Sequence, residues 1–258
     1  MTGETLIDPA ACIGQNVTIG HAVRIYGNVE IGDGCKIGDF SVIGCPAMAK
    51  GLPYLKLGPR ATIRSHAVIY EGSTIGPELE AGHHVVIREG TVIGENLRIG
   101  NLSDIEGNCK IGDFVRMHAY AHIGKGSVVG DFVWIFSLTT LMNDPLPPSH
   151  LFEPVTVGDM AIICVNAQCL PGAIIGRGAL IASGAVAQGD IPPGVIVTGA
   201  AGEVAGPVRL MLHLPTRTKH PWPRHFTDAY PDRTHERIRT LAAEINEEAA
   251  HFQARTKA

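Results

Sequence analysis

Aromatic residues are scarce in this chain of 258 residues, because Phe, Trp and Tyr together make up only 5% of it. Small aliphatic side chains must therefore fill its core. Basic residues are outnumbered as well: 21 Lys and Arg stand against 25 Asp and Glu, which gives a net charge of −4. Such a balance provides no global attraction for nucleic acid, so an anionic ligand would need a local basic site.

Long apolar runs and paired cysteines are also missing. No stretch approaches the roughly 18 apolar residues of a membrane span. The opening residues, MTGETLIDPA, have neither the basic nor the apolar part of a signal peptide. None of the six cysteines forms a CxxC pair, and we expect Cys35, Cys109 and Cys169 to be buried thiols in a reducing compartment. We therefore expect a cytoplasmic protein without a membrane partner.

The chain is rich in glycine, with 31 residues, and in a repeat of six residues. An aliphatic residue recurs at this interval over 7–43, 63–141 and 157–187, and Gly commonly follows it. A small or branched residue stands two positions earlier, on the same face of an extended strand. Because Gly permits the turn that follows, short strands can wind into a three-sided prism whose coils stack into one core. The repeats predict an all-β fold of about nine coils.

Two loops and a tail interrupt this repeat. Residues 45–60 and 142–154 are rich in proline and glycine, and we expect them to be surface excursions from the corners. The repeat domain covers residues 1–203, and residues 204–258 form an irregular segment with a helix over 233–253. We expect that helix to cap the last coil or to pack on a neighbouring subunit.

Bulky polar residues enter two of the three corners of the predicted prism. One corner column contains Tyr70, Arg88 and Glu106, whereas the column of Gly76 and Gly94 looks like plain scaffold. A second corner column contains Arg64 and His118. The edge between these two polar corners carries further polar side chains: His66, His84, Asn101, Asp104, Tyr120 and His122. A neutral imidazole near pH 7 is what a general base needs, so we interpret this edge as an active site.

Four stretches of the chain resemble the hexapeptide-repeat acyltransferases: IRSHAVIYEGSTIG, GHHVVIREGTVIGENLRIG, CKIGDFVRMHAYAHIG and MNDPLPP. Within that family they look most like bacterial N-acetyltransferases of nucleotide-linked amino sugars. The resemblance covers about residues 6–200 and implies a left-handed parallel β-helix. It also implies a homotrimer with active sites between subunits, acetyl-CoA as cosubstrate, no metal, and a dTDP-, UDP- or GDP-linked amino sugar as acceptor.

Amide formation then needs a group to take the amine proton and donors for the oxyanion. We expect His84 or His118 to take the proton and Glu106 or Asp144 to orient the amine. The remaining residues assigned to the acceptor are His66, Tyr70, Arg88, Glu89, Tyr120 and Asn143. An alternative needs no protein base, since a neutral amine can attack and the departing thiolate can collect the proton.

Acetyl-CoA should lie against the late coils, where NAQCLPGAIIGRGALIASGAVAQGD resembles the family's cofactor-binding run. Ser183, Gly184 and Ala185 would let the pantetheine arm approach the backbone. Many relatives carry a lysine where this chain has Glu203, so Arg177 and Arg209 are the candidates for the 3′-phosphate.

Three other functions stay open at this point. An O-acetyltransferase on the same fold differs from an N-acetyltransferase only in its acceptor. A γ-class carbonic anhydrase needs three histidines on one zinc, and the histidines of this chain fall in four different columns: His83, His84, His118 and His122. A non-catalytic β-helix would carry its histidines as surface residues.

Overall fold

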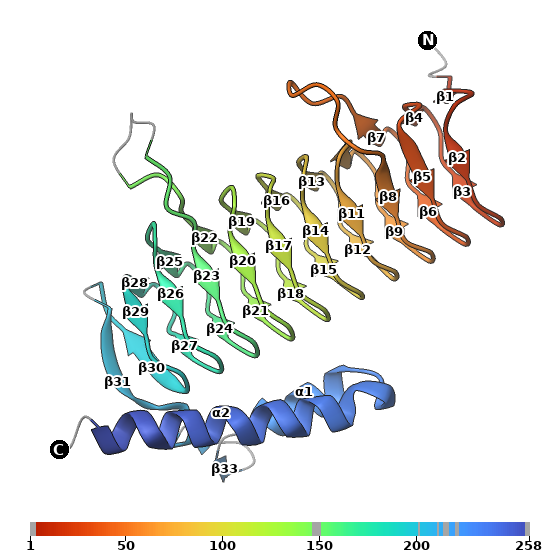
Figure 1. Cartoon of the computed structure of the whole chain (residues 1–258). Coiled ribbons are helices and arrows are strands. Elements are labelled where there is room, and N and C mark those ends of the chain that lie inside the picture. The colour runs from red at the N-terminus through yellow and green to blue at the C-terminus, as the bar shows by residue number, and fades with distance from the viewer. Residues whose placement is uncertain are drawn as a thin grey trace.

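The computed structural model describes residues 4–145, 151–200, 202–210, 212–213, 217–219 and 222–255. Its body is a left-handed parallel β-helix with three sheets, named sheets A, B and C here (Figure 1). Each coil contributes one short strand to each sheet, and neighbouring coils pair in parallel register, as where Val86 and Ile87 meet Asp104 and Ile105. The predicted fold is confirmed.

Sheet A has ten strands. They are β1 (Leu6–Ile7), β4 (Arg24–Ile25), β7 (Val42–Cys45), β10 (Val68–Tyr70), β13 (Val86–Ile87), β16 (Asp104–Ile105), β19 (His122–Ile123), β22 (Thr140–Leu141), β25 (Gln168–Cys169) and β28 (Val186–Ala187). Sheet B also has ten. They are β2 (Cys12–Ile13), β5 (Val29–Ile31), β8 (Leu55–Leu57), β11 (Thr74–Ile75), β14 (Val92–Ile93), β17 (Lys110–Ile111), β20 (Val128–Val129), β23 (Thr156–Val157), β26 (Ile174–Ile175) and β29 (Asp190–Ile191).

Sheet C has eleven strands, of which the last runs antiparallel to its neighbour. They are β3 (Thr18–Ile19), β6 (Lys36–Ile37), β9 (Thr62–Ile63), β12 (Glu80–Ala81), β15 (Arg98–Ile99), β18 (Arg116–Met117), β21 (Trp134–Ile135), β24 (Ile162–Ile163), β27 (Leu180–Ile181), β30 (Val195–Thr198) and β31 (Glu203–Pro207). We name the three edges of the prism the A–B, B–C and C–A corners, after the sheets that they join.

Ten strands in each parallel sheet make ten coils, one more than the repeat predicted. The missed inward positions are Leu57, Ile191 and Val197. They pair with their neighbours although the interval of six is broken before Leu57 and before Ile191. Loop 45–60 was therefore drawn too long, because β8 and the turn after it already belong to the β-helix. Both excursions leave after a sheet-A strand, at the A–B corner (Figure 1). Residues 146–150 of the second excursion lie outside the described residues.

The tail runs beside the coils. After η1 (Val208–Leu210) come the paired strands β32 (Leu212–His213) and β33 (Thr218–Lys219), then α1 (Trp222–Ala229), η2 (Asp232–Thr234) and α2 (His235–Arg255). The predicted helix is thus α2. It lies along the flank of its own β-helix instead of capping the last coil (Figure 1).

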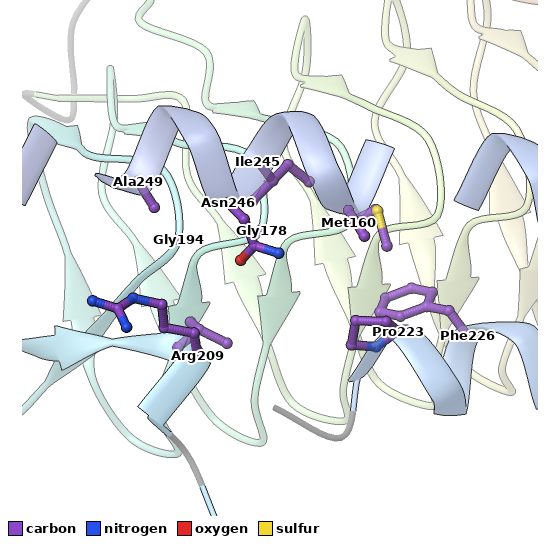
Figure 2. Close-up of a pocket in the computed structure, with 11 residues that line it drawn as sticks. Met160, Gly178, Gly194, Arg209, Pro223, Phe226, Ile245, Asn246 and Ala249 are labelled. Carbon is purple, nitrogen blue, oxygen red and sulfur yellow. The ribbon is translucent and has the colours of Figure 1, made fainter. Parts of the chain in front are cut away.

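The B–C corner, predicted to be plain scaffold, is the surface on which α2 docks. Its turn residues Phe114, Phe132 and Met160 are buried beneath the tail. Farther along, a Cβ added to Gly178 would lie 2.5 Å from Cγ2 of Ile245, so only glycine leaves room for the helix there. Figure 2 shows this packing and a crevice beside it of about 20 Å³, room for one water molecule and no ligand.

Candidate functional site

A groove runs along the outer face of sheet C and has two adjoining parts. The polar part encloses about 850 Å³ over the earlier coils, and the apolar part encloses about 770 Å³ over the later ones. Trp134 of β21 and Ala229 of α1 line both parts, so the two are continuous. We call the whole the sheet-C groove.

The polar part is lined by three arginines, two of them on adjacent coils. Arg98 and Arg116 are register partners on β15 and β18, and Arg64 follows β9. Glu80 pairs with Arg98 at 3.5 Å. Arg116 is only 7% exposed, and its guanidinium donates to the backbone oxygen of Asn96 at 2.6 Å and to Oδ1 of Asn96 at 2.8 Å. Burial lowers the pKa of Arg116 to about 10, so its charge persists at neutral pH.

A tyrosine of the tail packs beneath the junction of the two parts of the groove, against Trp134 and Arg116. Tyr230 follows α1 and is 5% exposed; its Oη donates to the backbone oxygen of Phe114 and accepts from Nε1 of Trp134. Its ring lies 4.5 Å from the guanidinium carbon of Arg116. The tail, Trp134 and Arg116 therefore hold one another in place where the two parts of the groove meet.

His118 lies at the same junction. It follows β18 on the C–A corner and lines the polar part of the groove. Its ring stacks on Phe136 at 4.6 Å and lies 6.2 Å from the ring of Trp134. Partial burial lowers the pKa of His118, which keeps the imidazole neutral at physiological pH. Of the predicted catalytic residues, His118 alone lines the groove.

The apolar part combines sheet C with the tail. Its walls are formed by Phe136, Ile162, Cys164, Leu180, Ala182 and Ser183 from the coils and by His225, Phe226 and Asp228 from α1. Of the residues assigned to acetyl-CoA, Ser183 lines this part, and Gly184 is exposed beside it.

The other three cofactor assignments meet different surroundings. Ala185 is fully buried in the core, so its side chain is closed to a ligand. Arg177 bonds Glu244 at 2.9 Å and Glu248 at 2.6 Å, both on α2, at the B–C corner. Arg209 lies beside α2 at the crevice of Figure 2 and not in the sheet-C groove. These three positions therefore give no support to the cofactor role that we assigned to them.

The remaining predicted residues divide between two corners. His66 and His84 stack at 4.6 Å on the C–A corner, exposed, where both have left-handed backbone with φ of 63° and 57°. Tyr120 occupies the same turn position and is 56% exposed. Across sheet A, Arg88 at the A–B corner bonds its neighbour Glu89 at 2.8 Å, so Glu106 is not its ion-pair partner.

The rest of the predicted acceptor set also lies at the A–B corner. The Arg88 guanidinium is 5.8 Å from the ring centroid of Tyr70. Glu106 accepts the backbone N–H of Lys125 at 3.2 Å. Asn143 and Asp144 begin the second excursion, where Asp144 is exposed. Within one chain, the width of sheet A separates these residues from His118.

Sequence reasoning missed a histidine–carboxylate pair. Nδ1 of His122 lies 2.9 Å from Oδ2 of Asp104, and both side chains are about one-third exposed on the outer face of sheet A. The hydrogen bond to the carboxylate raises the pKa of His122. The signal was available, because the two residues occupy register partners on β16 and β19.

The described residues contain no group of three or more His, Cys, Asp or Glu side chains arranged to hold a metal ion. In the same part of the chain, no helix combines the length and the apolar character needed to cross a membrane.

A model of the bacterial transferase hexapeptide family, built of six repeats, matches residues 13–45 and 90–125. Among curated proteins, a 2,3,4,5-tetrahydropyridine-2,6-dicarboxylate N-acetyltransferase of Staphylococcus aureus is 40% identical over 58 residues. That match covers 22% of this chain and 23% of the relative, so the chain spans less than a quarter of the length of the curated relatives it matches.

Among solved structures, a UDP-N-acetylglucosamine acyltransferase of Arabidopsis superposes with a TM-score of 0.60 at 18% identity, over 94% of this chain and 93% of that one. This likeness shows the fold. A GDP-perosamine N-acetyltransferase of Caulobacter crescentus, in complex with CoA and GDP-perosamine, matches at 23% identity over 54% of this chain and 56% of that one, with a TM-score of 0.26. The chain thus carries hexapeptide repeats that match the family model over these two stretches, and it has the fold of the Arabidopsis acyltransferase.

Proposed function

We propose that this hexapeptide-repeat protein transfers an acetyl group from acetyl-CoA to the amino group of a nucleotide-linked amino sugar. The observation that carries the proposal is the sheet-C groove, in which a basic part and an apolar part meet beside His118. An apolar channel suits the pantetheine arm and the thioester, whereas a basic one suits a phosphorylated acceptor. The N-acetyltransferase relatives named above support an amine as acceptor.

The reaction follows from this division of the groove. The thioester would enter from the later coils, past Ser183 and Cys164, and the amine from the earlier coils. Attack by the neutral amine forms the new C–N bond, and collapse of the intermediate breaks the C–S bond. His118 takes the proton of the amine and returns it to the departing thiolate, a role that its lowered pKa suits. A backbone N–H of a coil would hold the oxyanion.

The predicted catalytic residues of the A–B corner can reach His118 only if they come from a second copy of the chain. Glu106 and Asp144 lie across sheet A from His118 in one chain. A second copy whose A–B corner faced the groove would supply both of them. This division supports a homotrimer with active sites between subunits, as the family resemblance implies.

The first experiment is release of CoA thiol from acetyl-CoA with a panel of dTDP-, UDP- and GDP-linked 3-amino and 4-amino sugars. Hydroxyl sugars test O-acetylation, and an amino dicarboxylate tests the acceptor class suggested by the Staphylococcus relatives. Release with one nucleotide-linked amino sugar supports the proposal and names the substrate. If the folded protein acetylates only a hydroxyl sugar or the dicarboxylate, the proposed acceptor is wrong.

The role of His118 is tested with the active substrate. We expect His118→Asn to lower kcat by about a hundredfold, the scale of general-base catalysis. In the unaltered protein, kcat should fall only below pH 6.5, because the pKa of His118 is lowered. His84→Asn is the matched control, since asparagine tolerates the left-handed backbone at that corner. If both variants are as active as the unaltered protein at every pH, His118 is not the base, and the departing thiolate takes the proton of the amine.

A further inference from the structure

Two arginines occupy neighbouring positions on the floor of the sheet-C groove. Arg98 and Arg116 are register partners on adjacent parallel strands, so their Cα atoms are about 4.8 Å apart. Like charges directly opposite each other destabilise a sheet. Each charge favours the neutral form of the other, and the charge of Arg98 contributes to the lowered pKa of Arg116. The fold therefore maintains a repulsive pair at this position.

Protein groups offset only part of this charge. Glu80 pairs with Arg98 at 3.5 Å, but both side chains are about half exposed, so the pair is weak. In the described part of the chain, the hydrogen bonds of Arg116 go to neutral oxygens of Asn96 and Val115, and no carboxylate lies within ion-pairing distance of it. Because the pKa of Arg116 stays at about 10, its charge at neutral pH is not offset by an ion pair in this part of the chain.

Arg64 adds a third cation to the same lining. Against these three cations, Glu80 is the single carboxylate among the described residues that line the polar part. Two positive charges thus remain in excess in one groove, on a chain whose net charge is −4. Low-dielectric walls concentrate such a field and attract anions.

We propose that Arg64, Arg98 and Arg116 form an anion site that holds the diphosphate of the acceptor. The inference rests on the proposed function and deepens it by assigning the residues that recognise the phosphates. Guanidinium groups bind phosphate oxygens bidentately, and two of them one coil apart can each hold one phosphate of a linked pair. Arg116 is fixed by Asn96 and Tyr230, so it presents its charge without ordering a flexible side chain. Arg98 and Arg64 are exposed and can close on the ligand.

The test is binding of inorganic pyrophosphate at low salt, measured by calorimetry on the full chain. We expect the unaltered protein to bind it and Arg98→Gln and Arg64→Gln each to weaken binding about tenfold, the loss of one charge-assisted hydrogen bond. Lys110→Gln is the matched control, because Lys110 is exposed on sheet B and outside the groove. Its affinity should match that of the unaltered protein.

Three results would overturn the site: no binding of pyrophosphate, equal weakening by Lys110→Gln, or tighter binding of a dicarboxylate than of pyrophosphate. With the active amino sugar nucleotide, Arg98→Gln and Arg64→Gln should raise KM about tenfold with little change in kcat. A KM unchanged in both would overturn the inference while leaving the proposed function in place. If pyrophosphate binds through these arginines but no amino sugar is acetylated, the anion site stands and the proposed function is wrong.

Discussion

The hydroxyl of Tyr230 should be worth several kcal/mol to the docking of the tail. It accepts from Nε1 of Trp134 at 2.8 Å and donates to the backbone oxygen of Phe114 at 2.9 Å. Tyr230→Phe keeps the ring, with its packing against Phe226 and the Arg116 guanidinium, and removes both hydrogen bonds. Leaving a buried partner unsatisfied costs about 1–3 kcal/mol. Because Trp134 is partly exposed and water can reach its N–H, we expect a total loss of about 2–4 kcal/mol.

Urea unfolding followed by tryptophan fluorescence measures this loss. Tyr54→Phe is the control, since Tyr54 is 46% exposed on the first excursion, and it should change the free energy of unfolding by less than about 0.5 kcal/mol. A cycle with Trp134→Phe should give a coupling of about 1 kcal/mol. Burial raises the pKa of Tyr230 to about 12, so these effects should not change between pH 6 and 9. If Tyr230→Phe costs no more than Tyr54→Phe, the hydroxyl does not hold the tail.

Three further predictions concern other parts of the molecule. Gly178→Ala should lower the free energy of unfolding by about 1–3 kcal/mol in urea, because its Cβ would lie 2.5 Å from a side chain of α2; Gly184→Ala, where a Cβ meets nothing within 4 Å and φ is similar, is the control and should cost less. Asp104→Asn should lower the pKa of His122 in an NMR titration. The raised pKa of His122 stabilises the fold below its unfolded pKa of about 6.5 and ceases to do so as pH rises through the folded value. The variant should therefore lose stability at pH 5.5, by less than about 1 kcal/mol for so exposed a pair, and not at pH 8.5. If the proposed homotrimer packs through the exposed C–A corner, Tyr120→Glu should shift the mass in light scattering from trimer to monomer; a trimer of unchanged mass would mean that this corner is not in the interface.

Most of the fold could be predicted because one physical rule repeats along it. An aliphatic residue every six positions fills the core, and this interval identified most coils. The rule failed where the interval breaks before Leu57 and before Ile191, and Val197 was missed because it continues the shifted phase of Ile191. A strand of two residues is recognised only by its place in the repeat, so a shift in phase hides it.

The B–C corner shows which corner position carries information. Gly76 and Gly94, directly after the aliphatic residue, made this corner look like plain scaffold. The turn residue two positions later forms the surface on which the tail docks. Phe114 and Phe132 are buried at this position, and Gly178 leaves room there for α2. An apolar ring on an outward turn is the signal for a covering element, and it was visible in the sequence.

The candidate site was harder to predict. The spacing of 18 residues shows at which corner a residue lies, but not which of the two adjoining sheet faces its side chain covers. His118 and His84 share the C–A corner, yet His118 stacks on Phe136 and lines the sheet-C groove, whereas His84 stacks on His66. The groove also depends on Tyr230, which is 96 residues from Trp134 and 116 residues from Phe114, the two residues that it bonds. Side-chain direction and tail docking are tertiary properties that no spacing encodes.

The docking of α2 nevertheless follows from two spacings that agree. From Arg237 to Glu244 the helix rises by about 10 Å, and two coils of the β-helix advance by about the same distance. Arg237 bonds Asp113 and Asp131, and two coils beyond Asp131 Arg177 bonds Glu244. Because charges on the helix and on the corner recur at matching intervals, the helix is held in one register along the axis of the β-helix. The same register is consistent with the contact between Tyr230 and Trp134, which places Ala229 of α1 at the groove on the adjoining sheet.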